Sequence, residues 1–114
     1  KTDSEMKRYS VRWAAAARED LDRIVSYIAA HSLSSALNVA DTLEEMANTL
    51  HTFPRRGHVV PELDHHGIRQ WLQITTPPWR IVYRIEHRQV VIVALIDGRR
   101  SLEDALFDRL MQED

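Results

Sequence analysis

The sequence predicts a single α+β domain built from a strand, an antiparallel two-helix hairpin, a three-stranded antiparallel sheet and a C-terminal helix, in that order. Three observations lead to this fold class. Two segments in the first half carry apolar residues at helical spacing. Three later runs are rich in Ile, Val, Tyr and Trp and are separated by breakers. The 114 residues, 44% of them hydrophobic, suffice for one core but not for two.

The first strand is expected at residues 9–13, where apolar and polar side chains alternate. We place it at an edge of the sheet, and we expect the sheet as a whole to be antiparallel. Residues 1–8 are expected to form a poorly ordered leader, followed by one domain over residues 9–114.

Two amphipathic helices should follow. The first begins at Ala14 and ends near His31, and its apolar stripe consists of Leu21, Ile24, Val25 and Ile28. Residues 32–35 break the chain and supply hydroxyl groups that cap a second helix. The apolar positions of that helix are Ala36, Leu37, Ala40, Leu43, Met46, Ala47 and Leu50. Two such helices with a tight break predict an antiparallel hairpin that covers a sheet.

Residues 53–63 contain two prolines and Gly57 and are expected to be a connecting loop. The three strands then occupy residues 68–75, 79–86 and 89–97. Pro77 and Pro78 end the first of them, because proline has no N–H group for a ladder. The short polar break at residues 86–89 predicts a hairpin between the other two.

Alternation along the strands predicts which side chains share a face. In the first strand, one face should carry Ile68, Leu72 and Ile74, and the other Arg69, Trp71 and Gln73. In the second, one face should carry Trp79, Ile81, Tyr83 and Ile85, and the other Arg80, Val82, Arg84 and Glu86. The third strand is apolar on both faces from Val90 to Ile96, which is typical of a central strand. We therefore expect one packed face and one face with arginines.

The last helix should open at residues 101–104, where Ser101 and Asp104 have the spacing of a capping box. Its apolar side should consist of Leu102, Ala105, Leu106 and Leu110.

Charge is segregated along the chain, although the net charge is only −2. Residues 67–100 carry six arginines and two acids, a net charge of +4, whereas residues 14–53 and residues 101–114 each carry −4. A basic sheet between acidic helices would steer an anionic partner to one face. The alternative is that these arginines simply pair with nearby acids.

Several classes of function find no support in the sequence. There is no cysteine, which excludes disulfides and thiolate chemistry and fits a reducing cytoplasm. No apolar run approaches the roughly 20 residues that cross a bilayer. The adjacent His65 and His66 lack metal-ligand spacing, and no glycine-rich phosphate loop occurs. We therefore expect no cofactor, no metal and no membrane partner.

Three motifs resemble the RelE/ParE superfamily of bacterial type II toxins, and the match as a whole covers about residues 9–112. They are the helix opening at residues 17–28, Pro54-Arg55-Arg56-Gly57 with Pro61-Glu62-Leu63, and Trp79-Arg80-Ile81-Val82-Tyr83-Arg84-Ile85 followed by Gly98-Arg99-Arg100. The resemblance implies a cytoplasmic toxin that a cognate antitoxin neutralises by wrapping around its helices and sheet. Operator DNA would then be contacted only through the antitoxin.

The resemblance also implies one of two mechanisms. ParE-like members poison DNA gyrase, whereas RelE-like members cut mRNA on the ribosome. Arg80 and Arg100 match phosphate-binding arginines of RelE-like members, and Arg99 matches a further basic position. Proton-transfer groups are missing, however, because Trp71 and Gln73 stand where those members carry lysines, and residues 105–108 offer no titratable ring. We therefore favour the ParE-like mechanism and name no catalytic residue with confidence.

The residues expected to contact the antitoxin or the target are Arg69, Trp71, Arg80, Arg84, Arg99 and Arg100. The register across Pro77 and Pro78 leaves open which face these arginines share. Two alternatives to gyrase inhibition remain at this point. One is a ribosome-dependent mRNA endonuclease that uses Arg80 and Arg100, and the other is a chain that has lost toxicity and acts only as a corepressor of the antitoxin.

Overall fold

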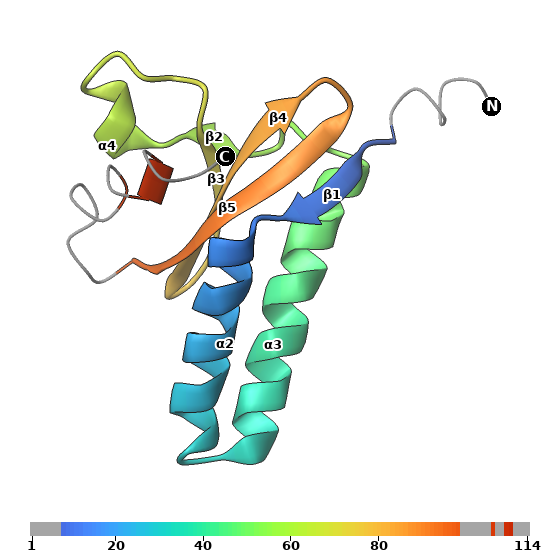
Figure 1. Ribbon diagram of the computed structural model, residues 1–114, viewed down its shortest axis with the longest axis vertical. Coiled ribbons are helices and arrows are strands. Elements are labelled where there is room, and N and C mark those ends of the chain that lie inside the picture. The colour runs from blue at the N-terminus through green and yellow to red at the C-terminus, as the bar shows by residue number, and fades with distance from the viewer. Residues whose placement is uncertain (1–7, 99–105, 107–108, 111–114) are drawn as a thin grey trace.

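The computed structural model describes residues 8–98, 106, 109 and 110. It is a mixed α+β structure in which a helical hairpin stands on a strongly twisted sheet (Figure 1). Its elements are β1 (Ser10–Trp13), α2 (Ala15–Ala29), α3 (Leu33–Asn48), the 3-10 turn η1 (Thr49–His51), β2 (His58–Val59), α4 (Pro61–Asp64), β3 (Leu72–Thr76), β4 (Trp79–Glu86) and β5 (Gln89–Asp97). The described residues contain no helix that is both long and apolar enough to cross a membrane.

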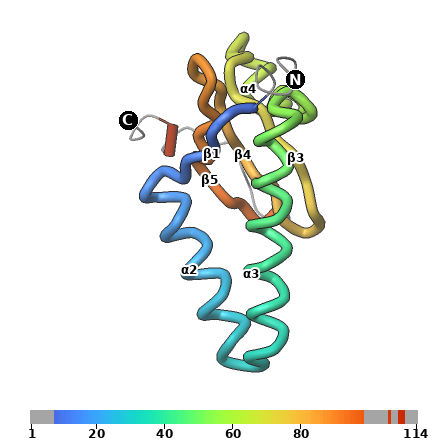
Figure 2. Tube along the Cα trace, turned by 90° about the vertical axis from the view of Figure 1, so that its right-hand side faces the viewer, coloured from blue at the N-terminus to red at the C-terminus, as the bar shows by residue number. Residues whose placement is uncertain are grey.

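The five strands form one sheet in the order β1-β5-β4-β3-β2. The α2–α3 hairpin lies against one face, and its far end extends well beyond the sheet (Figures 1 and 2). Helix α4 and the helical residues Leu106 and Leu110 lie on the opposite face. Each face of the sheet therefore has its own core.

The two cores follow from alternation along the strands. The hairpin-side core joins helix residues to strand residues, and its largest members are Leu21, Leu43, Leu50, Ile81, Tyr83 and Ile92. The opposite core is Ala14, Val60, Leu63, Val82, Val91, Val93, Ala94 and Leu106. This arrangement confirms the expected faces of β4 and the expected burial of β5 on both sides, because β5 contributes to both cores.

The sequence located β4 and β5 at the bounds that the structure has, and the edge position of β1 is also confirmed. A bulge interrupts β4 and β5, where Val82 pairs with Ala94 but Tyr83 pairs with Ile92. The extra residue places Val93 and Ala94 in the same core, which strict alternation does not allow.

The expectation of a wholly antiparallel sheet is wrong for β1, which runs parallel to β5 from Ser10 to Trp13. Only Ala14 separates β1 from α2, and its N–H donates to the carbonyl oxygen of Ile92 at 2.9 Å. The direction of β1 is therefore set by where α2 must begin to pack against β5. The strands from β2 to β5 are antiparallel, as predicted.

The strand expected at residues 68–75 begins only at Leu72. Ile68 was assigned to the same face as Leu72 and Ile74, but it packs with Trp71 in the opposite core. The chain is not extended there: Gly67 has a φ of +74° and ends the turn after α4, so alternation does not reach back to Ile68. Leu37 was placed in the apolar stripe of the second helix, yet its side chain is 55% exposed.

The predicted loop at residues 53–63 contains two elements that the sequence did not reveal. The two-residue strand β2 pairs with β3, and Pro61 begins the one-turn helix α4, a position that suits proline because the first N–H groups of a helix are unbonded. The capping box at residues 101–104, with Leu102 and Ala105, lies outside the described residues, as do residues 1–7 of the expected leader. Leu106 and Leu110 are helical, as predicted, and they pack in the opposite core.

Tyr83 anchors the turn at Pro54 and Gly57 to the sheet. Its hydroxyl donates to the Pro54 carbonyl at 2.8 Å and accepts from the Gly57 N–H at 3.1 Å. A Cβ atom on Gly57 would lie 2.6 Å from that hydroxyl and 2.6 Å from the Gln73 carbonyl oxygen. Gly57 is therefore required by close packing. The motif Pro54-Arg55-Arg56-Gly57 therefore holds the segment that follows η1 against β3 and β4.

Candidate functional site

The candidate site is the sheet face opposite the hairpin, and we call it the arginine face. It consists of Glu62, Trp71, Gln73, Arg80, Arg84 and Glu86. Alternation along β4 directs Arg80 and Arg84 away from the hairpin, together with Val82 between them. The structure thus resolves which face the arginines of β4 share.

Arg80 is held by two elements at once. Its Nη1 atom donates to Oε1 of Glu62 on α4 at 2.9 Å and to Oε1 of Gln73 on β3 at 3.1 Å. The side chain is 21% exposed. Both bonds leave from the same nitrogen, so the described residues place no acceptor on Nε or Nη2. Arg80 is therefore fixed in place while it keeps donors for a further acceptor.

Arg84 lies between an acid and an aromatic ring. Its Nε and Nη2 atoms donate to Oε2 of Glu86 at 2.9 and 2.8 Å, and its guanidinium carbon is 5.7 Å from the centre of the Trp71 ring. The hydrogen bond and charge of Arg84 lower the pKa of Glu86 below its ordinary value. Only 12% of the Arg84 side chain is exposed. This guanidinium is ordered by its neighbours in a cation–π arrangement.

Arg12 belongs beside this cluster, although the sequence argument did not single it out. The strand register places Arg12 opposite Val91, and Val91 opposite Arg84. The charge of Arg12 contributes to the lowered pKa of Glu86. Its alternation with Val11 and Trp13, which pack on the hairpin side, was a usable signal that Arg12 faces the other way.

The other sequence-predicted residues are less connected to this face. Arg69 lies on the connection between α4 and β3, where it pairs with Asp64 at 2.5 Å and is 65% exposed. Trp71 belongs to the face through its packing in the opposite core and its contact with Arg84. Arg99 and Arg100 lie outside the described residues. The structure therefore brings together Trp71, Arg80 and Arg84 among the predicted six.

The arrangement suits recognition of a protein rather than proton transfer. Between the two arginines lies Val82, which is fully buried in the aliphatic opposite core, so no titratable side chain separates them. The carboxylates of Glu62 and Glu86 are both engaged by arginines. Within the described part of the chain, no three His, Cys, Asp or Glu side chains are grouped to hold a metal ion. Ordered guanidinium groups beside the Trp71 ring match carboxylates of an acidic protein segment.

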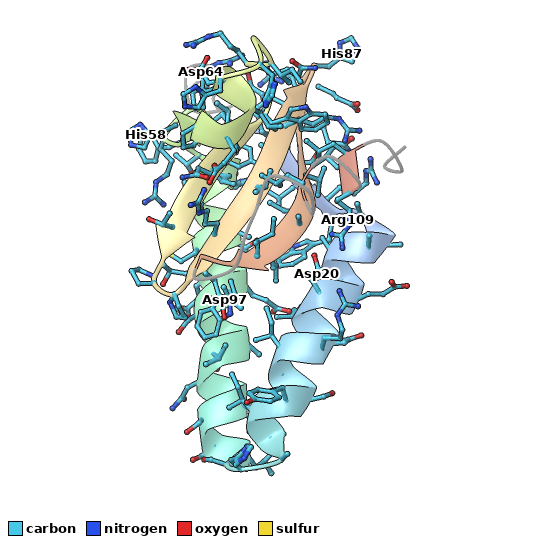
Figure 3. All side chains as sticks on the ribbon, turned by 90° about the vertical axis from the view of Figure 1, so that its left-hand side faces the viewer. Asp20, His58, Asp64, His87, Asp97 and Arg109 are labelled. Atoms are coloured by element: carbon cyan, nitrogen blue, oxygen red, sulfur yellow. The ribbon has the colours of Figure 1, made fainter. Side chains whose placement is uncertain are left out.

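A second ionic cluster was missed altogether by the sequence argument. Asp20 of α2 is buried and accepts from both terminal nitrogens of Arg109, at 2.7 and 2.9 Å, and from the Leu95 N–H at 3.0 Å (Figure 3). Arg109 also donates to the Val93 carbonyl at 3.1 Å. The cluster joins α2, β5 and the C-terminal helical residues, so it supports the opposite core, on which the arginine face lies.

Comparison with known proteins places this architecture among bacterial toxins. The family model described as the ParE toxin of the type II toxin–antitoxin system parDE matches residues 11–102. Toxin ParE3 of Caulobacter vibrioides is 29% identical over 85 residues, which span 73% of this chain and 80% of that protein.

Two solved structures share the fold. A chain of the chromosomal ParDE toxin–antitoxin system from P. aeruginosa superposes with a TM-score of 0.65 at 19% identity, over 80% of this chain and 97% of that one. A chain of the RelBE2 toxin–antitoxin complex from Mycobacterium tuberculosis gives a TM-score of 0.52 at 23% identity, over 83% of this chain and 97% of that one. At these identities the two structures support the fold alone.

Proposed function

This chain belongs to the ParE toxin family of type II toxin–antitoxin systems, and from that membership we propose that it stops replication in bacterial cells by inhibiting DNA gyrase. In this proposal the chain acts by binding and not by its own chemistry. A cognate antitoxin in the cytoplasm neutralises it, and contact with operator DNA occurs only through that antitoxin.

The observation that favours binding over RNA cleavage is the state of Arg80 and Arg84. Each guanidinium is already paired with an acid of its own chain, Glu62 and Glu86, and little of either side chain is exposed. A nuclease needs cations presented to a phosphate and groups that move protons. Aliphatic side chains lie between these arginines, and the two lysines of the sequence are at positions 1 and 7. This supports a binding function over RNA cleavage.

We assign the arginine face to the antitoxin. Arg80 and Arg84 are held in fixed orientations, so little side-chain entropy is lost when a partner's carboxylate binds. Trp71 adds an aromatic surface of the kind enriched in interface hot spots. Arg69, at the edge of this face and largely exposed, would add attraction without a fixed geometry. Arg99 and Arg100 follow β5 in the sequence and are proposed as further contacts.

The target is tested by expressing the chain without its antitoxin and following DNA and protein synthesis with labelled precursors. Gyrase inhibition predicts that DNA synthesis stops first, with filamentation and double-strand breaks. Protein synthesis that stops first, with messages cut on ribosomes, would contradict the proposal and favour the endonuclease.

The antitoxin assignment is tested by binding measurements with the protein encoded next to this chain. Arg80→Ala and Arg84→Ala should each weaken binding by about tenfold or more, the effect of losing about 1.4 kcal/mol. Arg18→Ala is the matched control, because Arg18 is an exposed arginine on α2 that also pairs with an acid, Glu44. Equal losses in all three variants would show that general charge, and not this face, governs binding.

A further inference from the structure

We propose that the far end of the helical hairpin is a second docking surface, separate from the arginine face, and that it inserts into an apolar groove with a basic rim on the protein that the toxin inhibits. This inference rests on the proposed function in so far as that protein is gyrase. We call the surface the hairpin tip, and its large apolar members are Tyr27 at the end of α2 and Leu33 and Leu37 at the start of α3.

Exposure is the first argument. Among the described residues, four large hydrophobic side chains are exposed, and three of them form the hairpin tip: Tyr27 at 75%, Leu33 at 65% and Leu37 at 55%. Single exposed apolar residues are ordinary, but several at one end of an element indicate an interaction site. The tip projects away from the sheet, so neither core covers it (Figures 1 and 2).

The turn itself does not require these side chains. Ser32 caps α3 by accepting from the Ser35 N–H at 3.2 Å, and that cap is independent of the residue types at positions 33 and 37. Tyr27 contacts only the His31 ring, at 5.9 Å between ring centres, among the ring contacts of the described residues. The fold therefore gives no local reason for three large apolar groups to face solvent.

The distribution of charge is the second argument, and it indicates the partner. Residues 24–40 contain no Asp, Glu, Lys or Arg, although 28% of the chain is charged. The cores of protein interfaces are depleted of charge in the same way. Above the tip the exposed charges on the two helices are mainly acidic, with Glu19, Asp22, Asp41, Glu44 and Glu45 against Arg18 and Arg23. The complementary surface is an apolar groove whose rim carries Lys or Arg.

The same charges separate the tip from the arginine face. The arginine face together with Arg12 has three arginines and two acids and suits an acidic segment, whereas the flanks of the tip have five exposed acids and two arginines and suit a basic surface. One partner with one charge pattern does not suit both surfaces, because an acidic segment would be repelled by the net acidic flanks of the tip. The geometry therefore assigns the antitoxin to one surface and the inhibited protein to the other.

The test uses the whole chain with Leu33→Gln and Leu37→Gln combined, since glutamine keeps helix propensity while removing apolar surface. The double variant should keep its melting temperature and bind the antitoxin within about twofold of the original chain. Its growth arrest, and its inhibition of purified gyrase holoenzyme, should weaken by about tenfold or more. Leu33→Met with Leu37→Met should restore both activities, because methionine keeps the apolar surface.

Phe53→Ser is the matched control, because Phe53 is 64% exposed but follows η1 at the opposite end of the hairpin. It should leave growth arrest unchanged. Asp41→Lys with Glu45→Lys should reduce inhibition and reverse its dependence on salt, as expected for a basic rim.

Several results would overturn the inference. Full growth arrest by the glutamine variant would show that the tip does not contribute to target binding. Loss of antitoxin binding in that variant would show that the tip binds the antitoxin instead. If the original chain self-associates and the variant does not, the tip is an interface between two copies of the chain. If the original chain arrests growth without affecting gyrase, the proposed function fails, but the comparison of growth arrest among the variants still decides the role of the tip. If the original chain arrests nothing, both proposals fail.

Discussion

Arg109 donates both of its terminal nitrogens to the carboxylate of Asp20, although 89 residues separate them in the sequence. Asp20 also accepts from the Leu95 N–H, and Arg109 also donates to the Val93 carbonyl. Helix α2, strand β5 and the C-terminal helical residues are thereby joined through one ion pair (Figure 3). The pair lies beside the core that supports the arginine face, so its loss should affect both stability and binding.

Asp20→Asn should lower the free energy of unfolding by about 3 kcal/mol, because it leaves a largely buried guanidinium without its countercharge. Hydrogen bonding to Asp20 raises the pKa of Arg109 above its ordinary value. The variant loses that effect, but a guanidinium stays protonated in proteins in any case, so Arg109 cannot relieve the cost by deprotonation. Urea unfolding followed by circular dichroism measures the change. Asp22→Asn is the matched control on the exposed side of the same helix, and an equal loss there would contradict the account.

Gly57→Ala should destabilise the fold by about 2 kcal/mol, the usual cost of forcing a methyl group into packed surroundings. The new Cβ would meet the Gln73 carbonyl oxygen and the Tyr83 hydroxyl, each at 2.6 Å. The backbone carbonyl belongs to the sheet and cannot move away cheaply. His58→Ala, at the next and exposed position, should change the unfolding free energy by less than about 0.5 kcal/mol. A Gly57→Ala variant with an unchanged free energy of unfolding would show that the turn is not held as described.

Tyr83 should make the protein sensitive to alkali. Burial raises the pKa of the Tyr83 hydroxyl above its ordinary value of 10.0. The folded state therefore keeps this proton at a pH where the unfolded state has lost it, so the stabilising contribution is complete below pH 10 and is lost as pH rises above it. Unfolding measured at pH 8 and at pH 10.5 should show a fall in stability that Tyr83→Phe reduces. A fall of equal size in the variant would assign the effect to other groups.

Glu62→Gln should tighten antitoxin binding by about threefold while costing less than about 1 kcal/mol of stability. The substitution removes a negative charge 2.9 Å from Arg80 Nη1, which would otherwise repel an antitoxin carboxylate approaching the remaining donors of the guanidinium. Calorimetric titration of the variant with the antitoxin measures the change. Weaker binding would show instead that Glu62 positions Arg80 for the partner, and Arg80→Ala combined with Glu62→Gln would separate the two effects.

The elements that the sequence located best are those with local signals. Trp79–Glu86 and Gln89–Asp97 alternate clearly and are bounded by prolines or polar turn residues, so their limits were predicted correctly. The helical hairpin followed from the apolar spacing and from Ser32, whose capping role is confirmed. The family was likewise recognisable from motifs in order, and the family match confirms it.

What the sequence missed depends on contacts between distant residues. The parallel pairing of β1 depends on where α2 packs, and the placement of Val93 and Ala94 in one core depends on a bulge. Helix α4 is too short to have a periodic signal, yet it supplies Glu62 to Arg80. The partners of the arginines were proposed as a class, as nearby acids, but their identities required the fold. Asp20 and Arg109 carried no local signal at all.

The most direct test of gyrase inhibition combines the purified chain, gyrase holoenzyme and supercoiled plasmid. The account predicts that the chain traps cleaved DNA on gyrase, that added antitoxin reverses the effect, and that Leu33→Gln with Leu37→Gln weakens it. Gyrase that continues to supercoil DNA at every toxin concentration, while the same preparation cleaves messages on ribosomes, would contradict the account.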